Sequence, residues 1–258
     1  MKILFVASEG LPFSKTGGLA DVVEALPKSL VALGHEVSVL LPRYRKTKVV
    51  GVSEPSLTVA MGDALRFPCI AEGGAIHGVY YYFVDDPEYF DREQLYGVAG
   101  KDYPDNAERF AEFCGAAIEF CKHVWMPDVI HCHDWQAALI PVFLQTRYAE
   151  DRSVADLPVV FTIHNMGYHG AFPPETMKKI GLPESLFSIN GMEFFGQVNF
   201  LKDPSPNIAK RSLCRAQDST SSNRRHSRFP SSGPRDFVQL RPNLGRTPGF
   251  LFLPRISC

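Results

Sequence analysis

The chain has 258 residues, 45% of them hydrophobic, which is enough for one large domain or two small ones with a substantial core. The net charge of −1 favours no class of charged partner for the chain as a whole. The first apolar run is too short for a signal peptide, and no run approaches the ~20 residues of a membrane span. We therefore expect a cytoplasmic protein that does not bind membranes. The six cysteines lack any CxxC or metal-type spacing, which is typical of reduced, buried thiols.

The apolar residues predict alternating strands and helices from the start of the chain. Residues 2–8 form a continuous apolar run, as in a strand covered on both faces. Residues 19–34 have helical spacing, with Gly34 as the C-terminal cap and Pro27 as a kink or break. Residues 35–42 read as the next strand. The short connections predict a βαβ unit, and hence a parallel sheet.

The same alternation continues towards residue 165. It predicts strands at 77–86, 128–134 and 158–165 and helices at 105–125 and 135–148. The helix at 105–125 carries one apolar stripe, formed by Phe110, Phe113, Ala117 and Phe120. The sequence therefore predicts an α/β fold over residues 1–201, a doubly wound, Rossmann-like parallel sheet.

The composition changes near residue 201. Residues 202–258 contain 2 Lys and 9 Arg against 3 Asp, a net charge of +8, whereas residues 1–201 carry −9. This tail is rich in Ser, Arg and Pro and has no sustained apolar period, so we expect it to be disordered. A basic tail can bind RNA at low salt whatever its sequence, so we expect no specific nucleic-acid partner.

The segment SKTGGLADV, residues 14–22, lies between the first strand and the first helix. In an open α/β sheet this loop is at the ligand-binding edge. Gly17 and Gly18 allow a ligand to approach the backbone, the helix N-terminus adds partial positive charge, and Lys15 adds a full one. These features favour a phosphate or diphosphate, with Asp21 capping free N–H groups or accepting from sugar hydroxyls. The spacing fits neither common nucleotide motif, and a plain glycine turn with a solvated lysine is the alternative interpretation.

Polar clusters stand at the ends of two later strands of the predicted sheet. The residues are His131, His133, Asp134 and Trp135 in HCHDW, and His164, Asn165, Tyr168 and His169 in TIHNMGYHG. With the glycine loop they would meet at one sheet edge and form a site. We expect no metal there, because no H-E-x-x-H or carboxylate spacing accompanies the histidines. Trp135 is either a core residue or a platform for a sugar.

Taken together, these motifs resemble one enzyme family. The bacterial glycogen synthase and plant starch synthase family is similar in SEGLPFSKTGGLADVVEALPKSL, VIHCHDWQAALIP and FTIHNMGYHG. The resemblance implies the N-terminal half of a GT-B glycosyltransferase, in which two Rossmann-like domains face each other. It also implies transfer of glucose from ADP-glucose to the non-reducing end of an α-1,4-glucan, with retention and without a metal or other cofactor.

The resemblance also implies roles for individual residues. Lys15, Gly17 and Gly18 correspond to contacts with the donor diphosphate, and Asp21 to a neighbouring donor-site residue. His164 corresponds to the catalytic histidine beside the transferred glucose, and Asn165 to its partner in donor binding. Tyr96, Asp134 and Trp135 correspond to the acceptor side.

The resemblance ends after FGQVNFLK, near residue 202. The family's second domain supplies an Arg and a Lys that neutralise the leaving diphosphate, so we expect this chain alone to be inactive. We hypothesise that residues 202–258 are out of frame, through a frameshift or a mis-assembled gene. A non-catalytic glucan- or nucleotide-binding half-domain is the alternative function.

Overall fold

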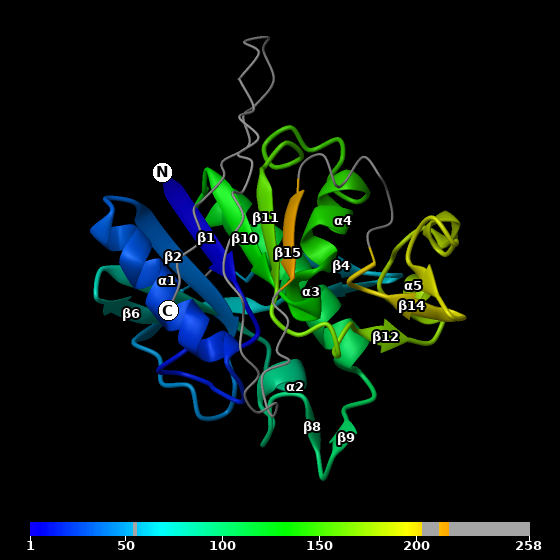
Figure 1. Cartoon of the computed structure of the whole chain (residues 1–258), viewed down its shortest axis with the longest axis horizontal. Helices are drawn as coiled ribbons and strands as arrows, with labels where there is room; N and C mark the ends of the chain where they lie inside the picture. Colours follow the sequence, from blue (N-terminus) through cyan, green and yellow to red (C-terminus); the bar gives the residue numbers. More distant parts are fainter. Residues whose placement is uncertain (54–55, 203–211, 217–258) are drawn as a thin grey trace, which may run out of the picture. The chain divides into compact units, whose positions relative to one another are not determined.

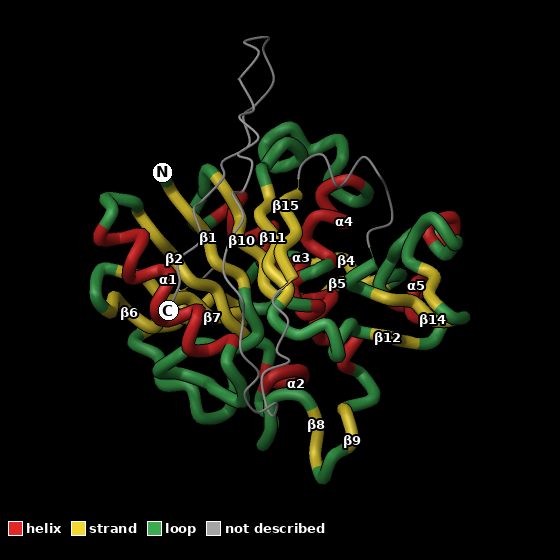
Figure 2. The backbone as a smooth tube through the Cα atoms, viewed as in Figure 1, coloured by secondary structure: helices red, strands yellow, loops and turns green. Residues whose placement is uncertain are grey.

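The structure, a computed structural model, describes residues 1–53, 56–202 and 212–216. In this part of the chain an eight-stranded sheet forms the centre of the fold (Figures 1 and 2). From one edge to the other its strands are β15 (Ser212–Ala216), β11 (Val159–Ile163), β10 (Val129–His133), β1 (Lys2–Val6), β2 (Glu36–Pro42), β7 (Val79–Asp85), β6 (Cys69–Ile76) and β3 (Gly51–Ser53).

The first six of these strands are parallel, and β6 and β3 add to the β7 edge in antiparallel fashion. In chain order the described parallel strands lie 3-2-1-4-5-6, counted from β7 to β15, which is the Rossmann arrangement. The order reverses between β1 and β10, because β2 and β7 are added on one side of β1 and the later strands β10, β11 and β15 on the other side. The predicted doubly wound α/β fold is therefore confirmed.

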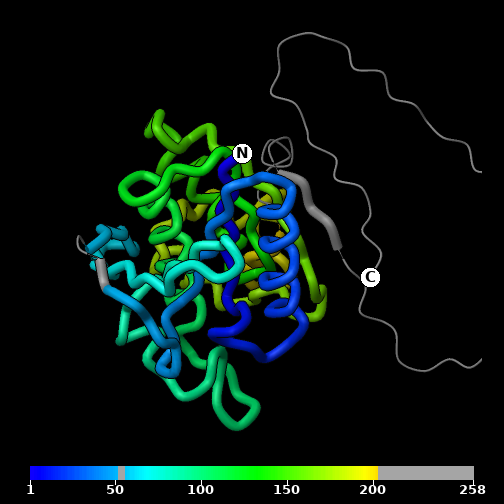
Figure 3. Tube along the Cα trace, turned by 90° about the vertical axis from the view of Figure 1, so that its left-hand side faces the viewer, coloured from blue at the N-terminus to red at the C-terminus, as the bar shows by residue number. Residues whose placement is uncertain are grey.

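Helices cover both faces of the sheet (Figure 3). On one face α1 (Leu19–Ala32) packs Val23 and Leu30 against Phe5 of β1 and Val39 of β2. On the other face lie α3 (Asn106–His123) and α4 (Leu139–Gln145), which pack against the opposite side chains of the same strands. A parallel strand between two helical layers buries every side chain, which explains the continuous apolar run of β1.

Helix α3 is almost completely buried. The predicted stripe of Phe110, Phe113, Ala117 and Phe120 has no exposed surface. The opposite side of the helix is also covered, because α3 contacts β4 (Val59–Met61) and α5 (Thr176–Lys179) as well as the sheet. The predicted helix at 105–125 is confirmed.

Two helices differ from the sequence prediction. No break occurs at Pro27, because α1 is one helix that buries this residue with Val23 and Leu30 and so offsets the one lost backbone hydrogen bond; the alternative, a kink at Pro27, stays a prediction. The helix predicted at 135–148 is shorter: a 3₁₀ turn at Trp135–Ala137 precedes α4. Pro141 lies in the first turn of α4, where no intrahelical N–H is required.

The remaining described elements are short. They are β5 (Ala64–Arg66), α2 (Pro87–Phe90), β8 (Gly97–Val98), β9 (Lys101–Asp102), β12 (Ala171–Phe172), a 3₁₀ turn at Glu184–Leu186, β13 (Glu193–Phe194) and β14 (Gln197–Asn199). The sequence analysis did not predict β3 to β6. The β6–β7 hairpin turns at His77 and Gly78, which both have positive φ.

The segment expected to be disordered lies mostly outside the described residues. Its described part, Ser212–Ala216, is the strand β15, which pairs in parallel with β11. These five residues are extended in the structure, and the expectation of disorder for residues 202–258 stays a prediction. The physical reason for this conformation is that a sheet edge offers backbone N–H and C=O groups, which pair with an extended segment of almost any sequence.

Three of the cysteines are buried and unpaired, as the spacing of the cysteines predicted. Cys114, Cys121 and Cys132 are buried free thiols, and burial raises the pKa of each. Among the described residues, none of the helices combines the length and the hydrophobicity that a membrane span requires.

Candidate functional site

The candidate site lies at the carboxyl ends of β1, β10 and β11. These strands are neighbours and run in the same direction, so the loops that follow them meet at one edge of the sheet (Figure 1). The strand order reverses between β1 and β10, and this is where open α/β sheets bind ligands. The structure therefore brings together the glycine loop and the two histidine-containing loops, as predicted.

A buried carboxylate, Glu9, holds the glycine loop. Glu9 is 2% exposed, and its oxygens accept hydrogen bonds from the main-chain N–H of Thr16 (2.5 Å), the hydroxyl of Thr16 (2.6 Å) and the main-chain N–H of Gly17 (3.1 Å). Charge-assisted bonds of this kind fix the loop in one conformation. The sequence analysis missed Glu9, because nothing in SEGLPF indicates that this glutamate turns inward.

The backbone conformation does not require glycine at positions 17 and 18. Neither has a positive φ, a Cβ on Gly18 would meet nothing within 4 Å, and one on Gly17 would lie 3.6 Å from Glu9 Oε1. Gly18 is the N-cap of α1 and provides no side-chain hydrogen bond to the first turn. The absence of side chains therefore leaves the backbone and the helix N-terminus open, as close approach of an anion requires.

Lys15 and Asp21 form an ion pair across this helix N-terminus. The Lys15 Nζ lies 2.5 Å from Asp21 Oδ1, and both side chains are about half exposed. Such an exposed pair contributes about 0–1 kcal/mol, so an anionic ligand can compete for the lysine.

Three histidines, two within β10 and one directly after β11, form a connected row. His133 Nδ1 and His164 Nε2 are 2.9 Å apart, and His131 Nε2 is 2.8 Å from Thr162 Oγ1. The ring of Phe5 from β1 contacts both His131 and His133. Burial lowers the pKa of all three histidines, to about 3 for His131, so all three are neutral near pH 7.

Asp134 has a strained backbone. Its φ of 56° with ψ of −177° lies in a region that is essentially restricted to glycine. Its Oδ1 accepts a hydrogen bond from the main-chain N–H of His164 (2.6 Å), and so joins the loops after β10 and β11. Burial raises the pKa of this carboxyl group, and the N–H groups of His164 and Asn165 oppose that shift.

Tyr96 reaches the same edge from the segment before α3. Its hydroxyl lies 2.7 Å from Ser8 Oγ, next to Glu9, and its main-chain oxygen accepts from Asn106 Nδ2 (2.8 Å). Burial raises the pKa of Tyr96, so the phenol is protonated. Hydrogen bonds at the hydroxyl and at the main-chain oxygen therefore fix the position of Tyr96.

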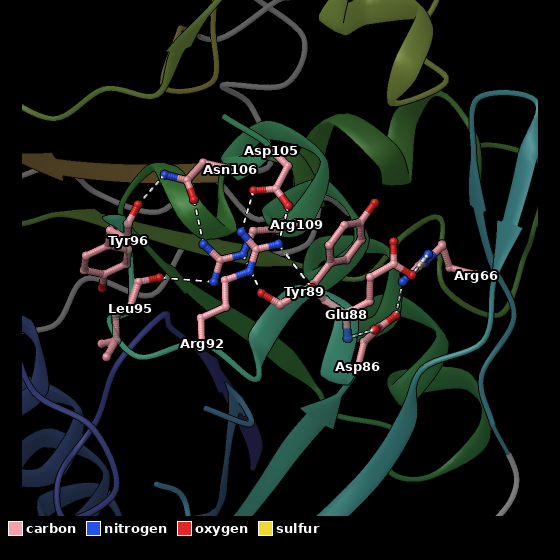
Figure 4. A network of polar contacts seen from close by, with 10 residues as sticks. All are labelled: Arg66, Asp86, Glu88, Tyr89, Arg92, Leu95, Tyr96, Asp105, Asn106 and Arg109. Atoms are coloured by element: carbon pink, nitrogen blue, oxygen red, sulfur yellow. Dashed lines mark hydrogen bonds and ion pairs between the residues drawn. The ribbon is translucent and has the colours of Figure 1, made fainter. Parts of the chain in front are cut away.

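A buried arginine anchors the Tyr96 segment to α3 (Figure 4). Arg109 has no exposed surface and donates to the main-chain oxygens of Tyr89 (2.7 Å) and Leu95 (3.1 Å) and to Asn106 Oδ1 (2.6 Å). A neighbouring network joins Arg66 to carboxylates that include Asp86 (2.6 Å). Sequence reasoning missed Arg109 because a lone arginine on a helix is usually solvated.

The other predicted residues are less closely enclosed. Asn165 is exposed, and its Oδ1 accepts from the main-chain N–H of Gly167 (2.9 Å). Tyr168 is 70% exposed, and His169 Nδ1 lies 2.9 Å from Asn199 Nδ2. The roles of these side chains stay predictions.

Trp135 lies in the hydrophobic core. It is 8% exposed, and its ring packs against Phe110 (5.0 Å between centroids) and Phe172 (5.5 Å), with Gly170 close beside it. This packing favours the core interpretation over an open platform for a sugar. A contact between Trp135 and an acceptor stays a prediction.

Comparison with known proteins identifies the family. A family model described as the starch synthase catalytic domain matches residues 2–211. The chain belongs to the starch synthase catalytic domain family. The match extends about ten residues beyond the segment in which the sequence analysis saw the resemblance.

Two bacterial relatives illustrate the similarity within this family. The chain is 57% identical to a glycogen synthase of Koribacter versatilis over 204 residues, which is 78% of this chain and 42% of that protein. It is 45% identical over 206 residues to a glycogen synthase of Geotalea uraniireducens, with 78% and 43% covered. The chain thus spans less than half the length of the curated relatives it matches.

A solved structure has the same fold. The catalytic domain of starch synthase IV from Arabidopsis thaliana, bound to ADP and acarbose, superposes with a TM-score of 0.70 and 25% identity over 82% of this chain and 50% of that one. The chain therefore has the α/β fold of one half of a GT-B starch synthase domain, as expected.

Proposed function

We propose that the described residues form the N-terminal half of a site that transfers glucose from ADP-glucose to the non-reducing end of an α-1,4-glucan, with retention. The observation that carries the proposal is the bare backbone of Gly17 and Gly18 at the open N-terminus of α1, beside Lys15. It occurs in a family of which one solved member is bound to ADP and acarbose.

The chemistry follows from where charge develops. When ADP leaves the glucose, negative charge grows on the diphosphate, and donors that are already in place stabilise it. Lys15 and the first N–H groups of α1 would supply such donors, with Glu9 holding the loop in place. Removing one preorganised donor of this kind costs about 3–4 kcal/mol in the transition state. We propose that no metal takes part, as the family resemblance implies.

We further propose that transfer needs residues outside this chain, since the matched region is less than half of the relatives' length. Purified 258-residue chain should incorporate no more glucose from ADP-glucose into glycogen than its His164→Ala variant. Incorporation clearly above that control would overturn this part of the proposal.

Donor binding tests the site itself. Titration calorimetry with ADP on the chain should show binding that Lys15→Gln weakens by tenfold or more, equivalent to about 1.4 kcal/mol. Lys28→Gln is the matched control, because Lys28 is an exposed lysine on the same helix and away from its N-terminus. Equal effects of the two substitutions would contradict a diphosphate site at Lys15.

The alternative, a non-catalytic glucan-binding half-domain, is less well supported. It would use Trp135, Tyr96 and the glycine loop, and of these Trp135 is in the core. Glycogen co-sedimentation of the chain, compared with a Tyr96→Ala variant, would revive it if binding depended on this side chain.

We also propose that the basic segment after residue 202 is out of frame. The support is its change of composition, from −9 over residues 1–201 to +8 over residues 202–258. Sequencing the locus across codons 195 to 215, and reading all three frames downstream of it, tests this. A second nucleotide-binding domain encoded downstream in another frame would support the proposal, and its absence from all frames would refute it.

A further inference from the structure

The contact between His133 and His164 has a chemical consequence for the ligand. The two rings are nearly coplanar, 18° apart, and meet through His133 Nδ1 and His164 Nε2 at 2.9 Å. Since both imidazoles are neutral, one nitrogen of this pair carries the hydrogen and the other provides the lone pair. If His133 Nδ1 carries this hydrogen, the hydrogen of His164 is on its Nδ1. If His164 Nε2 carries it, His164 Nδ1 has a lone pair instead.

The surroundings of His133 decide between the two arrangements. His133 has no exposed surface, and its Nε2 is enclosed without a hydrogen-bond partner among the described residues. If His164 donated, His133 would have to carry its hydrogen on Nε2, and a buried N–H would be left unpaired. Orphaned buried donors are rarer than under-satisfied acceptors. The arrangement in which His133 Nδ1–H donates leaves only an unpaired lone pair in the core.

The surroundings of His164 are compatible with the same arrangement. With His164 Nε2 acting as acceptor, its hydrogen is on Nδ1. The Asp134 carboxylate lies beside His164, bonded to its main-chain N–H at 2.6 Å, and interacts favourably with positive charge on this ring. The tautomer that carries its hydrogen on Nδ1 is therefore compatible with the nearby carboxylate, whose field favours positive charge on this ring.

His164 Nδ1 is the nitrogen that a ligand can reach. It forms no hydrogen bond with any residue that the structure describes, and it is not among the enclosed unpartnered atoms. His164 is half-buried at the end of β11. A hydrogen-bond acceptor bound at this edge can therefore pair with it.

We propose that His133 is a positioning residue that fixes His164 as the Nδ1–H tautomer, so that His164 offers the sugar nucleotide a hydrogen-bond donor and not a base. The identity of this ligand rests on the proposed function. The tautomer itself depends only on the contacts of the unliganded chain. The acceptor on the ligand would be a sugar hydroxyl or a phosphate oxygen.

Nitrogen NMR reads the tautomer directly. The 258-residue chain, labelled with ¹⁵N-histidine and held at about pH 8 so that imidazoles are neutral, gives long-range ¹H–¹⁵N correlations for each ring. His164 should show a pyrrole-type shift at Nδ1 and a pyridine-type shift at Nε2. Exposed His77 is the internal reference, and should show the Nε2–H form that free imidazole side chains favour. A pyridine-type His164 Nδ1 in the unsubstituted chain would overturn the proposal.

Two substitutions separate positioning from packing. His133→Asn keeps an N–H donor near the place of Nδ1, so His164 should remain Nδ1–H. His133→Leu keeps the volume but removes the donor, so His164 should shift towards Nε2–H. If His133→Leu does not fold, the unsubstituted chain and His133→Asn still decide. Loss of the Nδ1–H form in a folded His133→Asn variant, or its retention in His133→Leu, would refute the role of His133.

Addition of ADP-glucose separates this inference from the proposed function. A change in the Nδ1 shift of His164 on titration supports both. An Nδ1–H tautomer that ADP-glucose does not perturb would leave the role of His133 intact and count against the sugar-nucleotide site.

Discussion

The backbone strain at Asp134 gives a prediction that can be worked out from the structure. This residue combines two opposing effects: a φ of 56° with ψ of −177°, and a side-chain hydrogen bond to the main-chain N–H of His164 at 2.6 Å. Such a conformation costs of order 1–3 kcal/mol in a residue with a Cβ. A hydrogen bond to a charged group stabilises by about 1.5–3 kcal/mol.

Asp134→Ala and Asp134→Gly remove the same hydrogen bond but differ in strain. Alanine keeps the Cβ and hence the strain, so its free energy of unfolding should fall by about 1.5–3 kcal/mol. Glycine removes the strain, and its more flexible unfolded chain offsets roughly 0.5–1 kcal/mol of that gain. The glycine variant should therefore be at least as stable as the alanine variant, by up to roughly 2.5 kcal/mol.

Urea unfolding of the chain and the two variants, followed by circular dichroism, measures this difference. The comparison is valid if the dependence on denaturant, the m value, is the same for all three proteins. A glycine variant less stable than the alanine variant by roughly 0.5–1 kcal/mol, the entropic cost of glycine alone, would show that Asp134 carries no backbone strain. The reasoning from φ and ψ would then fail.

Three further predictions concern other parts of the fold. Gly18→Ala should leave the free energy of unfolding unchanged or slightly higher, but should weaken ADP binding in calorimetry. Gly34→Ala is the contrasting variant, because Gly34 has a φ of 87°, and it should lower the free energy of unfolding by about 1 kcal/mol. A loss of stability in Gly18→Ala would contradict an open loop. Arg109→Met should lower the urea midpoint by an amount equivalent to about 2 kcal/mol or more, because two partly buried carbonyl oxygens lose their donor at about 1–3 kcal/mol each; an unchanged midpoint would show that those oxygens find other partners. Burial raises the pKa of Glu112 to about 9, so the folded chain holds this proton more tightly than the unfolded chain. The free energy of unfolding should therefore fall as the pH rises from about 4.5 towards 9. Urea midpoints measured across this pH range should fall less in Glu112→Gln, and the same pH dependence in both proteins would exclude Glu112 as the cause.

Much of the fold could be predicted because it depends on local apolar periods. Strands β1, β2, β10 and β11 and helix α3 were predicted from runs and stripes of apolar residues, and the structure buries those residues between two layers. The β6–β7 hairpin was missed, because β6, with the sequence CIAEGGAI, has two glycines and no clear alternation. Its strand conformation comes from pairing with β7, which is a property of the neighbour.

The candidate site was predicted in part for the same reason. The placement of SKTGGLADV, HCHDW and TIHN at one edge follows from parallel strands, which all end at the same side of a sheet. The orientation of individual side chains did not follow. Glu9 turns inward to bind Thr16 and Gly17, and Trp135 turns into the core, because the space available to each is set by residues far away in the chain.

The sequence by itself determined the strands β1, β2, β7, β10 and β11 with the helices between them, the family resemblance and the loops that would meet. Only the tertiary structure decided how those loops are held. His133 and His164 are 31 residues apart in the chain but share one hydrogen bond, and the strain at Asp134 is maintained by a bond to a neighbouring strand's loop. The physical reason is that a helix or strand period is encoded in consecutive residues, whereas burial, tautomers and strained backbones depend on contacts that exist only after the strands have paired.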